Sequence, residues 1–203
     1  SCGCDQAALR QPPPLLLPWR LRYLALCAST ERELSRCLQQ GAEPPLAVVA
    51  RRQRYGVGQH GRHWQSPAGG LWLSAAIPWQ KPLSAALAEH LPRRMAASLA
   101  AELVPWSAGA SPPLTIKSPN DLMVGQRKLA GVLSSVIWRG TQPRLLRFGI
   151  GLNGRHPIAP PGITLEQWLG DRCPRFDQLL MLGLGAIERL AREAENWDTE
   201  PCL

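Results

Sequence analysis

The 203-residue sequence lacks the segments that would anchor a protein in a membrane or mark it for secretion. No run approaches the roughly 20 consecutive apolar residues that a transmembrane helix needs. No secretory signal is recognisable either, because the apolar run at 15–17 is short and is bounded by prolines. We therefore expect a cytoplasmic protein with no membrane partner, whose cysteines at positions 2, 4, 27, 37, 173 and 202 are reduced thiols.

Signatures of covalent catalysis and of bound zinc are also missing. The sequence contains no His-Glu-x-x-His motif, no Gly-x-Ser-x-Gly elbow and no Walker-type phosphate loop. Cys2-Gly3-Cys4 has no second cysteine pair to complete a zinc site. We expect a reaction that uses no protein nucleophile.

The composition is that of a globular protein with an anionic partner. Hydrophobic residues make up 45% of the chain, which is ordinary for a folded protein, and the length suffices for one substantial domain. The formal net charge of +8 predicts either nucleic acid or a nucleotide together with an acidic protein as the partner.

Hydrophobic patterning predicts an α+β fold with a mixed, mostly antiparallel sheet flanked by helices. Apolar runs indicate strands at 21–26, 46–50, 71–77, 114–117, 128–138 and 145–153. Helical spacing indicates a helix that Ser29 and Thr30 cap and Gly41 ends, a second over 84–104, and a last one from Phe176 to Leu190. Residues 1–18 are expected to form a flexible leader, 19–195 one domain and 196–203 a tail.

The segment 51–64 combines glycines with positive charge. Gly56, Gly58 and Gly61 allow sharp turns, so successive N–H groups can form an anion-binding nest, with arginines at 51, 52, 54 and 62 around it. The simpler interpretation is an exposed hairpin loop with solvated arginines. A Rossmann site is rejected despite the Gly-x-Gly-x-x-Gly spacing, because a strand and not a helix follows.

Lys117 closes an apolar run and is followed by a proline turn. Burial beside Leu114 and Ile116 would be costly for a lysine without an anionic ligand, whereas exposure at the strand end is the simpler interpretation. Asn120 is either a ligand contact or a turn former. Lys128 is expected to face solvent.

Two further groups of residues are candidates for ligand contact. Ser29 and Thr30 serve either as helix caps or as hydroxyl donors to a polar ligand. Gly149 and Gly151 alternate in a strand that ends at Asn153, and glycine weakens a strand unless something approaches its backbone closely. A flat ligand lying across the strand would explain this pattern.

Four motifs in this order resemble the catalytic domain of biotin–protein ligases. The family patterns G-R-G-R-x-G-R-x-W, K-W-P-N-D, K-L-A-G-I-L and G-I-G-x-N correspond to residues 56–64, 117–121, 128–133 and 149–153. The resemblance covers roughly residues 21–190. It implies the biotin–lipoate ligase fold, which is similar to that of class II aminoacyl-tRNA synthetases.

The resemblance also implies a two-step reaction. Biotin and ATP, with Mg²⁺, would give biotinyl-5′-adenylate, and a lysine of a biotin carboxyl carrier protein, the carrier subunit of acetyl-CoA carboxylase, would then take the biotinyl group. Lys117 is expected to be catalytic and to contact biotin. The other expected biotin contacts are Ser29, Thr30, Gln53, Gly56, Val57, Gly58, Gln59, Gly131, Gly149 and Gly151. The expected ATP or adenylate contacts are Gly61, Arg62, Trp64, Asn120 and Asn153.

The chain departs from the family pattern at several positions. Val57 and Gln59 stand where the family has arginines, Ser118 replaces a tryptophan and Glu31 replaces an asparagine. No helix-turn-helix domain precedes the motifs, so we expect no specific DNA binding. The small C-terminal SH3-like barrel of the family is expected to be absent, and a homodimer is left open.

Two other functions are weighed against the ligase. A lipoate or octanoate ligase or transferase shares the fold and the transfer to a carrier lysine, but the motifs beginning at Lys117 and Lys128 favour biotin. A non-catalytic domain that binds biotin or nucleic acid would explain the altered loop and the net charge of +8. The scattered tryptophans do not form the aromatic stripe that nucleic-acid binding favours.

Overall fold

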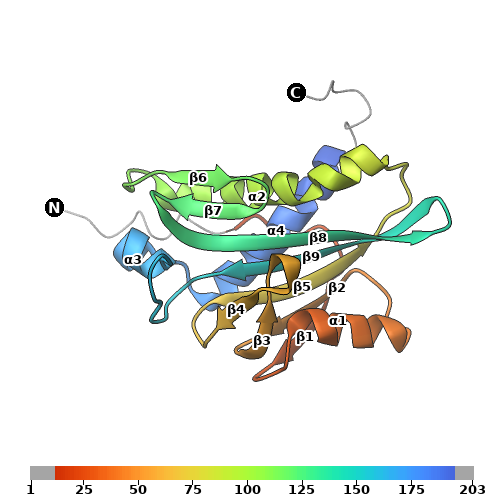
Figure 1. Cartoon of the computed structure of the whole chain (residues 1–203), viewed down its shortest axis with the longest axis horizontal. Coiled ribbons are helices and arrows are strands. Elements are labelled where there is room, and N and C mark those ends of the chain that lie inside the picture. The colour runs from red at the N-terminus through yellow and green to blue at the C-terminus, as the bar shows by residue number, and fades with distance from the viewer. Residues whose placement is uncertain (1–11, 195–203) are drawn as a thin grey trace.

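The computed structural model of the chain describes residues 12–194. Within that range seven strands form one sheet in the order β1-β2-β5-β9-β8-β7-β6 (Figure 1). Only β1 and β2 are parallel among these neighbours, and every other described pair is antiparallel. The strand bounds are β1 Arg20–Leu24, β2 Leu46–Ala50, β5 Leu71–Pro78, β6 Leu114–Lys117, β7 Asp121–Val124, β8 Arg127–Arg139 and β9 Gln142–Leu152. The predicted mixed, mostly antiparallel α+β fold is confirmed.

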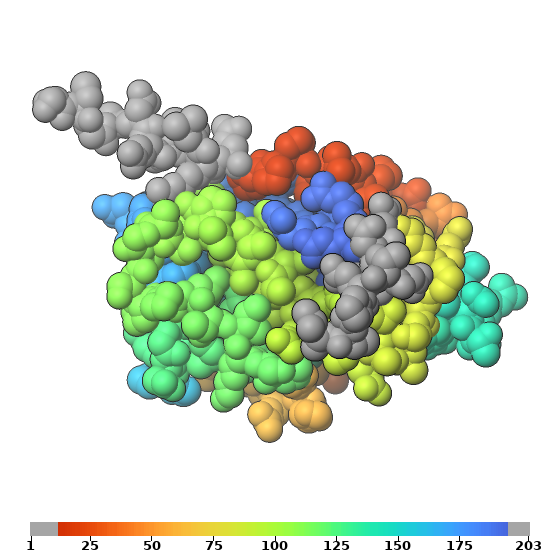
Figure 2. Space-filling model, turned by 90° about the horizontal axis from the view of Figure 1, so that it is seen from above, coloured from red at the N-terminus to blue at the C-terminus, as the bar shows by residue number. Residues whose placement is uncertain are grey.

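Alternation along the strands decides which face of the sheet carries the core. In β9, Leu146, Phe148, Ile150 and Leu152 are buried on one face, so the odd-numbered residues between them face the other way. Two long helices, α2 (Ala85–Ser107) and α4 (Phe176–Glu193), cover the core face. They lie side by side over it in Figure 2, α2 in yellow-green and α4 in blue.

The opposite face is covered only in part. Helix α1 (Thr30–Gln39) packs on β2 and β5 through a small second core that includes Leu34 and Val48. A separate hairpin, β3 (Gln53–Val57) and β4 (His63–Ser66) with the short turn η1 (Gln59–Gly61), lies beside α1 (Figure 1). The remaining short elements are α3 (Leu165–Leu169) and η2 (Gly170–Arg172). The uncovered part of this face is where a ligand can reach the sheet.

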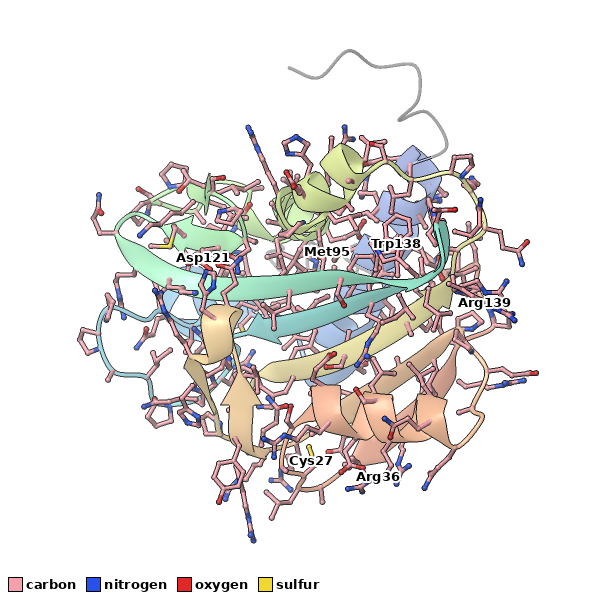
Figure 3. The ribbon with its side chains drawn as sticks, turned by 45° about the vertical axis from the view of Figure 1, so that its right-hand side comes forward. Cys27, Arg36, Met95, Asp121, Trp138 and Arg139 are labelled. Carbon is pink, nitrogen blue, oxygen red and sulfur yellow. The ribbon has the colours of Figure 1, made fainter. Side chains whose placement is uncertain are left out.

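β8 and β9 form a long hairpin that carries Trp138 and Arg139 near its turn (Figure 3). Met95 lies between α2 and the sheet, in the core. Of the described helices, none combines the length and apolar character that crossing a bilayer requires.

The helix boundaries agree with the sequence in position but not in every detail. Helix α1 begins after Ser29 and ends before Gly41, whose φ of +85° is the left-handed conformation that glycine adopts easily. The Ser29 hydroxyl makes no capping bond, however, so the expected hydroxyl cap is wrong. Gly183 lies inside α4, where glycine is intrinsically unfavourable. A side chain there would meet Leu71 at 2.8 Å, so the glycine allows α4 to approach β5 closely.

The described part of the expected leader is attached to the domain. The backbone N–H groups of Leu16 and Leu17 donate to the buried carboxylate of Glu188 at 2.8 and 2.9 Å, and Leu15 and Leu17 pack on the core. Residues 12–18 therefore differ from the expected loose segment. The rest of the leader, the tail at 196–203 and the cysteines at 2, 4 and 202 lie outside the described residues.

Candidate functional site

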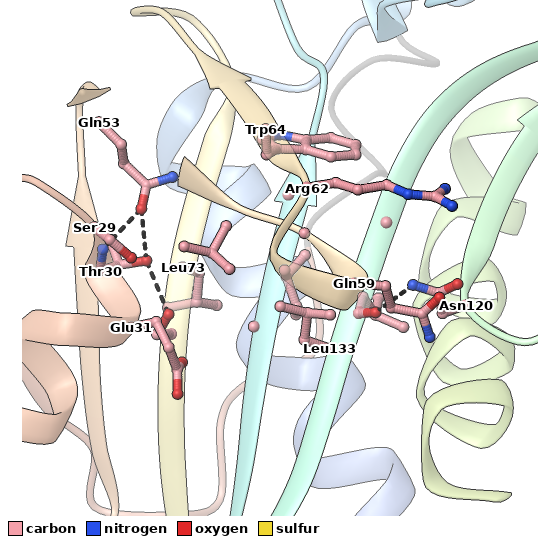
Figure 4. Close-up of a pocket in the computed structure, with 18 of the residues that line it drawn as sticks. Ser29, Thr30, Glu31, Gln53, Gln59, Arg62, Trp64, Leu73, Asn120 and Leu133 are labelled. Carbon is pink, nitrogen blue, oxygen red and sulfur yellow. Dashed lines mark hydrogen bonds between the residues drawn. The ribbon is translucent and has the colours of Figure 1, made fainter. Parts of the chain in front are cut away.

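A cavity of about 300 Å³ lies between α1, the β3–β4 hairpin and the exposed face of the sheet. Figure 4 shows Ser29, Thr30 and Gln53 gathered on one side of it and Gln59 and Asn120 on the other. Its volume is at the lower end of the range for small-molecule sites. The lining residues that the sequence predicted are Ser29, Thr30, Gln53, Val57, Gly58, Gln59, Arg62, Trp64, Asn120, Gly131, Gly149 and Gly151.

Hydrogen bonds organise the end of the cavity beside α1. The Gln53 amide oxygen accepts from the Thr30 N–H at 2.7 Å and from the Thr30 hydroxyl at 3.0 Å. Because that hydroxyl has one proton, Ser74 must be the donor in its 2.8 Å contact with Thr30. The Gln53 NH₂ group donates to Ser66 at 2.8 Å, which fixes the amide orientation. The Ser74 oxygen is thereby left as an acceptor on the cavity wall.

The glycine-rich hairpin contributes side chains more than free N–H groups. The Gly58 N–H donates to the Arg62 carbonyl at 2.7 Å, and the Arg62 N–H donates to the Gln59 carbonyl at 3.1 Å. Two N–H groups of the expected anion-binding nest are therefore used within the loop itself. Val57, Gln59 and Arg62 face the cavity instead.

Two predicted glycines of this hairpin do not line the cavity. A side chain at Gly56 would lie 2.4 Å from the Trp64 carbonyl oxygen, so this glycine is needed where β3 and β4 approach each other. Gly61 adopts a φ of +72° in the turn. Both residues shape the loop in this structure, and their predicted ligand contacts stay predictions. The arginines at 51, 52 and 54 also lie outside the lining, whereas Arg62 belongs to it.

The indole of Trp64 covers the glycines of the sheet. Gly131 and Gly151 are cross-strand partners, and side chains there would come within 3.1 and 2.7 Å of the Trp64 ring. Of the two glycines that were expected to admit a flat ligand, Gly151 accommodates Trp64, whereas Gly149 lies against Leu133. The indole N–H is buried and has no hydrogen-bond partner among the described residues.

Lys128 extends over the same surface. Its ammonium lies 2.7 Å from a carboxylate oxygen of Asp121 and 5.0 Å from the centroid of the Trp64 ring. Its side chain is 34% exposed and lines the cavity. Since an ammonium has three N–H donors, two remain for an anion after the contact with Asp121. The expectation that Lys128 faces only solvent is wrong.

Lys117 lies outside the cavity. It pairs with Asp121 of β7, which itself lines the cavity, so Lys117 stands one strand beyond the lining, a separation of about 5 Å across the sheet. It is exposed at the end of the edge strand β6. Of the two interpretations of Lys117, exposure at the strand end is the one observed, and its expected catalytic role and ligand contact stay predictions.

The two predicted asparagines have different places. Asn120 lines the cavity, and its amide donates to the Val132 carbonyl at 2.8 Å. Asn153 does not line it. The Asn153 amide donates to the carbonyls of Lys128 and Ile163 at 3.2 and 3.1 Å, and its backbone N–H donates to Leu129 at 3.0 Å. Asn153 therefore braces the strand segment that carries Lys128.

Sequence reasoning missed several lining residues, namely Glu31, His63, Leu73, Ser74, Asp121, Lys128, Val132, Leu133 and Ile150. Most of them lie inside the motifs that were noted, namely His63, Asp121, Lys128, Val132, Leu133 and Ile150. The apolar ones are strand residues whose place in the wall depends on the fold. Among the described residues, no three His, Cys, Asp or Glu side chains gather as a metal site.

The described cysteines do not take part. Burial raises the pKa of the Cys173 thiol to about 11. Burial, together with the nearby Glu33 carboxylate, also raises the pKa of Cys27. Both thiols are neutral near pH 7, and neither lines the cavity.

Comparisons with known proteins agree with one another. Residues 23–153 match the family model described as the biotin/lipoate A/B protein ligase family. The biotin–[acetyl-CoA-carboxylase] ligase of Paracoccus denitrificans is 32% identical over 130 residues, which cover 64% of this chain and 52% of the relative. The bifunctional ligase/repressor BirA of Bacillus subtilis is 29% identical over 134 residues, 66% of this chain and 40% of the relative. The chain thus spans about half or less of these curated relatives.

Solved structures share the fold. The biotin protein ligase from Aquifex aeolicus in complex with biotin and ATP superposes with a TM-score of 0.66 at 27% identity, covering 87% of this chain and 72% of that one. The Leishmania major ligase in complex with biotinyl-5-AMP has a TM-score of 0.65 at 23% identity, covering 90% and 81%. The second likeness concerns the fold alone.

The contact between Trp64 and the glycine pair can be tested by adding a methyl group. Gly151→Ala places a carbon 2.7 Å from the indole, so the ring must move. We expect a loss of about 1–3 kcal/mol in the free energy of unfolding and a shifted Trp64 indole N–H signal in NMR spectra, assigned with Trp64→Phe. Gly149→Ala is the control, because its methyl would meet Leu133 at an ordinary 3.4 Å. An unchanged Trp64 signal in Gly151→Ala would contradict the contact.

Proposed function

Because the chain belongs to the biotin/lipoate A/B protein ligase family, we propose that it activates biotin with ATP and transfers the biotinyl group to a lysine of a carrier protein. The observation that carries this proposal is the cavity with two unlike ends. Hydrogen-bonding groups of α1, β3 and β5 line one end, and the ammonium of Lys128 lies at the other. Such a cavity suits an acid whose far end is polar but uncharged.

In the first step, a carboxylate oxygen of biotin forms a bond to the α-phosphorus of ATP, and pyrophosphate leaves. Two anions must meet, so a cation near the reacting oxygens lowers the barrier. Lys128 is the side chain we assign to this task, because two of its donors remain for the carboxylate and the phosphate. Mg²⁺ enters with the ATP phosphates, as part of the substrate.

In the second step, the amine of the carrier lysine attacks the acyl carbon of biotinyl-5′-adenylate. AMP leaves, an amide forms and the amine loses a proton to solvent. Gln59 and Arg62 of the hairpin line the cavity, and we assign them to covering the adenylate against water. The carrier is proposed to be the biotin carboxyl carrier protein of acetyl-CoA carboxylase, in keeping with the name of the Paracoccus relative, and the reaction to occur in the cytoplasm.

The end of the cavity beside α1 favours biotin over lipoate or octanoate. The ureido ring of biotin offers N–H donors and a carbonyl acceptor. The Ser74 oxygen can accept from such an N–H, and the Ser29 hydroxyl can donate to the carbonyl. The hydrocarbon end of octanoate would leave these groups unpaired, which costs binding energy.

Small-molecule products identify the activated acid. The protein is mixed with ATP, Mg²⁺ and either biotin, lipoate or octanoate, and the products are analysed by mass spectrometry. We expect biotinyl-adenylate. Lipoyl- or octanoyl-adenylate would move the protein to the other branch of the family, and the absence of every adenylate would favour a binding domain without catalysis.

The assignment of Lys128 departs from the sequence analysis, which expected Lys117 to be catalytic and Lys128 to face solvent. Lys128→Ala should lower the rate of adenylate formation by about 10²–10³, as is typical when one electrostatic stabiliser is removed. Lys117→Ala should stay within about twofold of the wild-type rate, because Lys117 stands outside the cavity. Single-turnover formation of biotinyl-adenylate measures both. A large loss in Lys117→Ala with none in Lys128→Ala would overturn the assignment.

The hairpin makes a further prediction. Gln59 lines the cavity where the resembling family has an arginine, so Gln59→Arg should slow the release of biotinyl-adenylate by about tenfold through one added charge-assisted hydrogen bond. His60→Arg is the matched control, because it adds the same charge at an exposed position of the same loop. Filter-retention assays measure release. Equal release from both variants and the wild type would refute this role for the loop.

A further inference from the structure

Arg147 lies on the cavity face of β9, next to the strand residues that form the cavity floor. It is two residues before Gly149 and four before Gly151, so strand alternation puts all three on one face. Its cross-strand partners are Ala76 on β5 and Ser135 on β8. On the same face of the sheet, the next pairs along the strands are those that Gly149 makes with Ser74 and Leu133. Arg147 therefore flanks the end of the cavity beside α1.

The Arg147 guanidinium holds the first turn of α1. Its Nη2 donates to a Glu31 carboxylate oxygen at 2.5 Å and to the Ser35 hydroxyl at 2.7 Å, and it lies 3.4 Å from the Glu31 carbonyl oxygen. Glu31 lines the cavity and lies beside Thr30 in Figure 4. The Arg147 side chain is only 14% exposed. A nearly buried cation thus joins the strand of the cavity floor to a residue of the cavity wall.

Fold stability does not explain this pair. The Nε–H of Arg147 is buried and has no acceptor among the described residues, and such a leftover donor costs free energy. Replacing a buried ion pair by apolar side chains is often neutral for stability. The pair is better explained by what it positions.

The first turn of α1 is fixed from three strands. Gln53 of β3 and Ser74 of β5 bind Thr30, and Arg147 of β9 binds Glu31. Ser29, which is assigned to the far end of the acid, and Thr30, which holds Ser74, precede Glu31 directly. A shift of Glu31 would therefore move them relative to the sheet.

We propose that Arg147 is a positioning residue for the acid: through Glu31 it sets the place of Ser29 and Thr30 and so determines affinity for the uncharged end of the substrate. The proposal rests on the proposed function and names a specificity determinant of that same site. Arg147 acts at the acid end and away from Lys128, so it affects the acid and not the nucleotide.

The test compares the affinities for biotin and ATP in matched variants. Arg147→Met should raise the Kd for biotin, measured by calorimetry, by about tenfold, the loss expected for one charge-assisted hydrogen bond. The Kd for ATP and kcat should change less than twofold. Arg147→Lys should restore most of the affinity. The double variant Glu31→Gln/Arg147→Met should bind biotin about as weakly as Arg147→Met alone, because the contact is already lost when one partner is removed.

Arg155→Met is the matched control. Arg155 also joins a carboxylate, Glu166, to a backbone carbonyl, that of Cys173, but outside the cavity lining. It should leave the Kd for biotin unchanged. Hydrogen exchange adds a readout that needs no ligand, and Arg147→Met should speed exchange of the amides at the start of α1.

The outcomes separate the two proposals. If the wild type binds biotin and Arg147→Met binds it equally well, or loses affinity for ATP to the same extent, the role of Arg147 is refuted and the proposed function stands. If the wild type binds no biotin, the proposed function fails. In that case, faster exchange of the α1 amides in Arg147→Met would still show that Arg147 holds the first turn of α1. Unchanged exchange would refute that role as well.

Discussion

The ammonium of Lys128 lies over the cavity because β8 contains one residue more than the facing part of β7. Ala130 pairs with Leu122 and Lys128 pairs with Met123, so Leu129 is the extra residue of a β-bulge. Without it, strict alternation from Gly131 would put residue 129 on the cavity face and residue 128 on the core face. Leu129 is instead fully buried. Asn153 stabilises the bulge by donating hydrogen bonds to the carbonyls of Lys128 and Leu129, and Asp121 forms an ion pair with the ammonium.

The rest of the cavity is arranged around this cation. Trp64 packs on Gly131 of β8 and Gly151 of β9, and the Lys128 ammonium lies over the Trp64 ring. At the other end, Gln53 and Ser74 use their hydrogen bonds to hold Thr30, and Arg147 holds Glu31. Helix α1, the hairpin and the sheet are thus joined by side chains that also line or flank the cavity. The polar groups at one end and the cation at the other impose one orientation on an acid.

Much of this could be predicted from the sequence. Apolar runs located the main strands, because their alternation or full burial leaves a clear pattern. The family resemblance brought together Ser29, Gln53 and the glycines of β8 and β9, which all line one cavity. The sequence analysis chose Lys117, and a role for Lys128 could not be predicted, because both lysines border an apolar run. Only the pairing of β6, β7 and β8, with its bulge, moves Lys117 outside and Lys128 inside. Arg147 gave no signal, since its partner Glu31 is 116 residues away.

The most direct measurement is a crystal structure of the protein with biotinyl-5′-adenylate. The account predicts the Lys128 ammonium within hydrogen-bond distance of the oxygens that join the acyl group to the phosphate, with the ureido ring beside Ser29, Thr30 and Ser74. An adenylate that contacts Lys117 and leaves Lys128 paired only with Asp121 would contradict it.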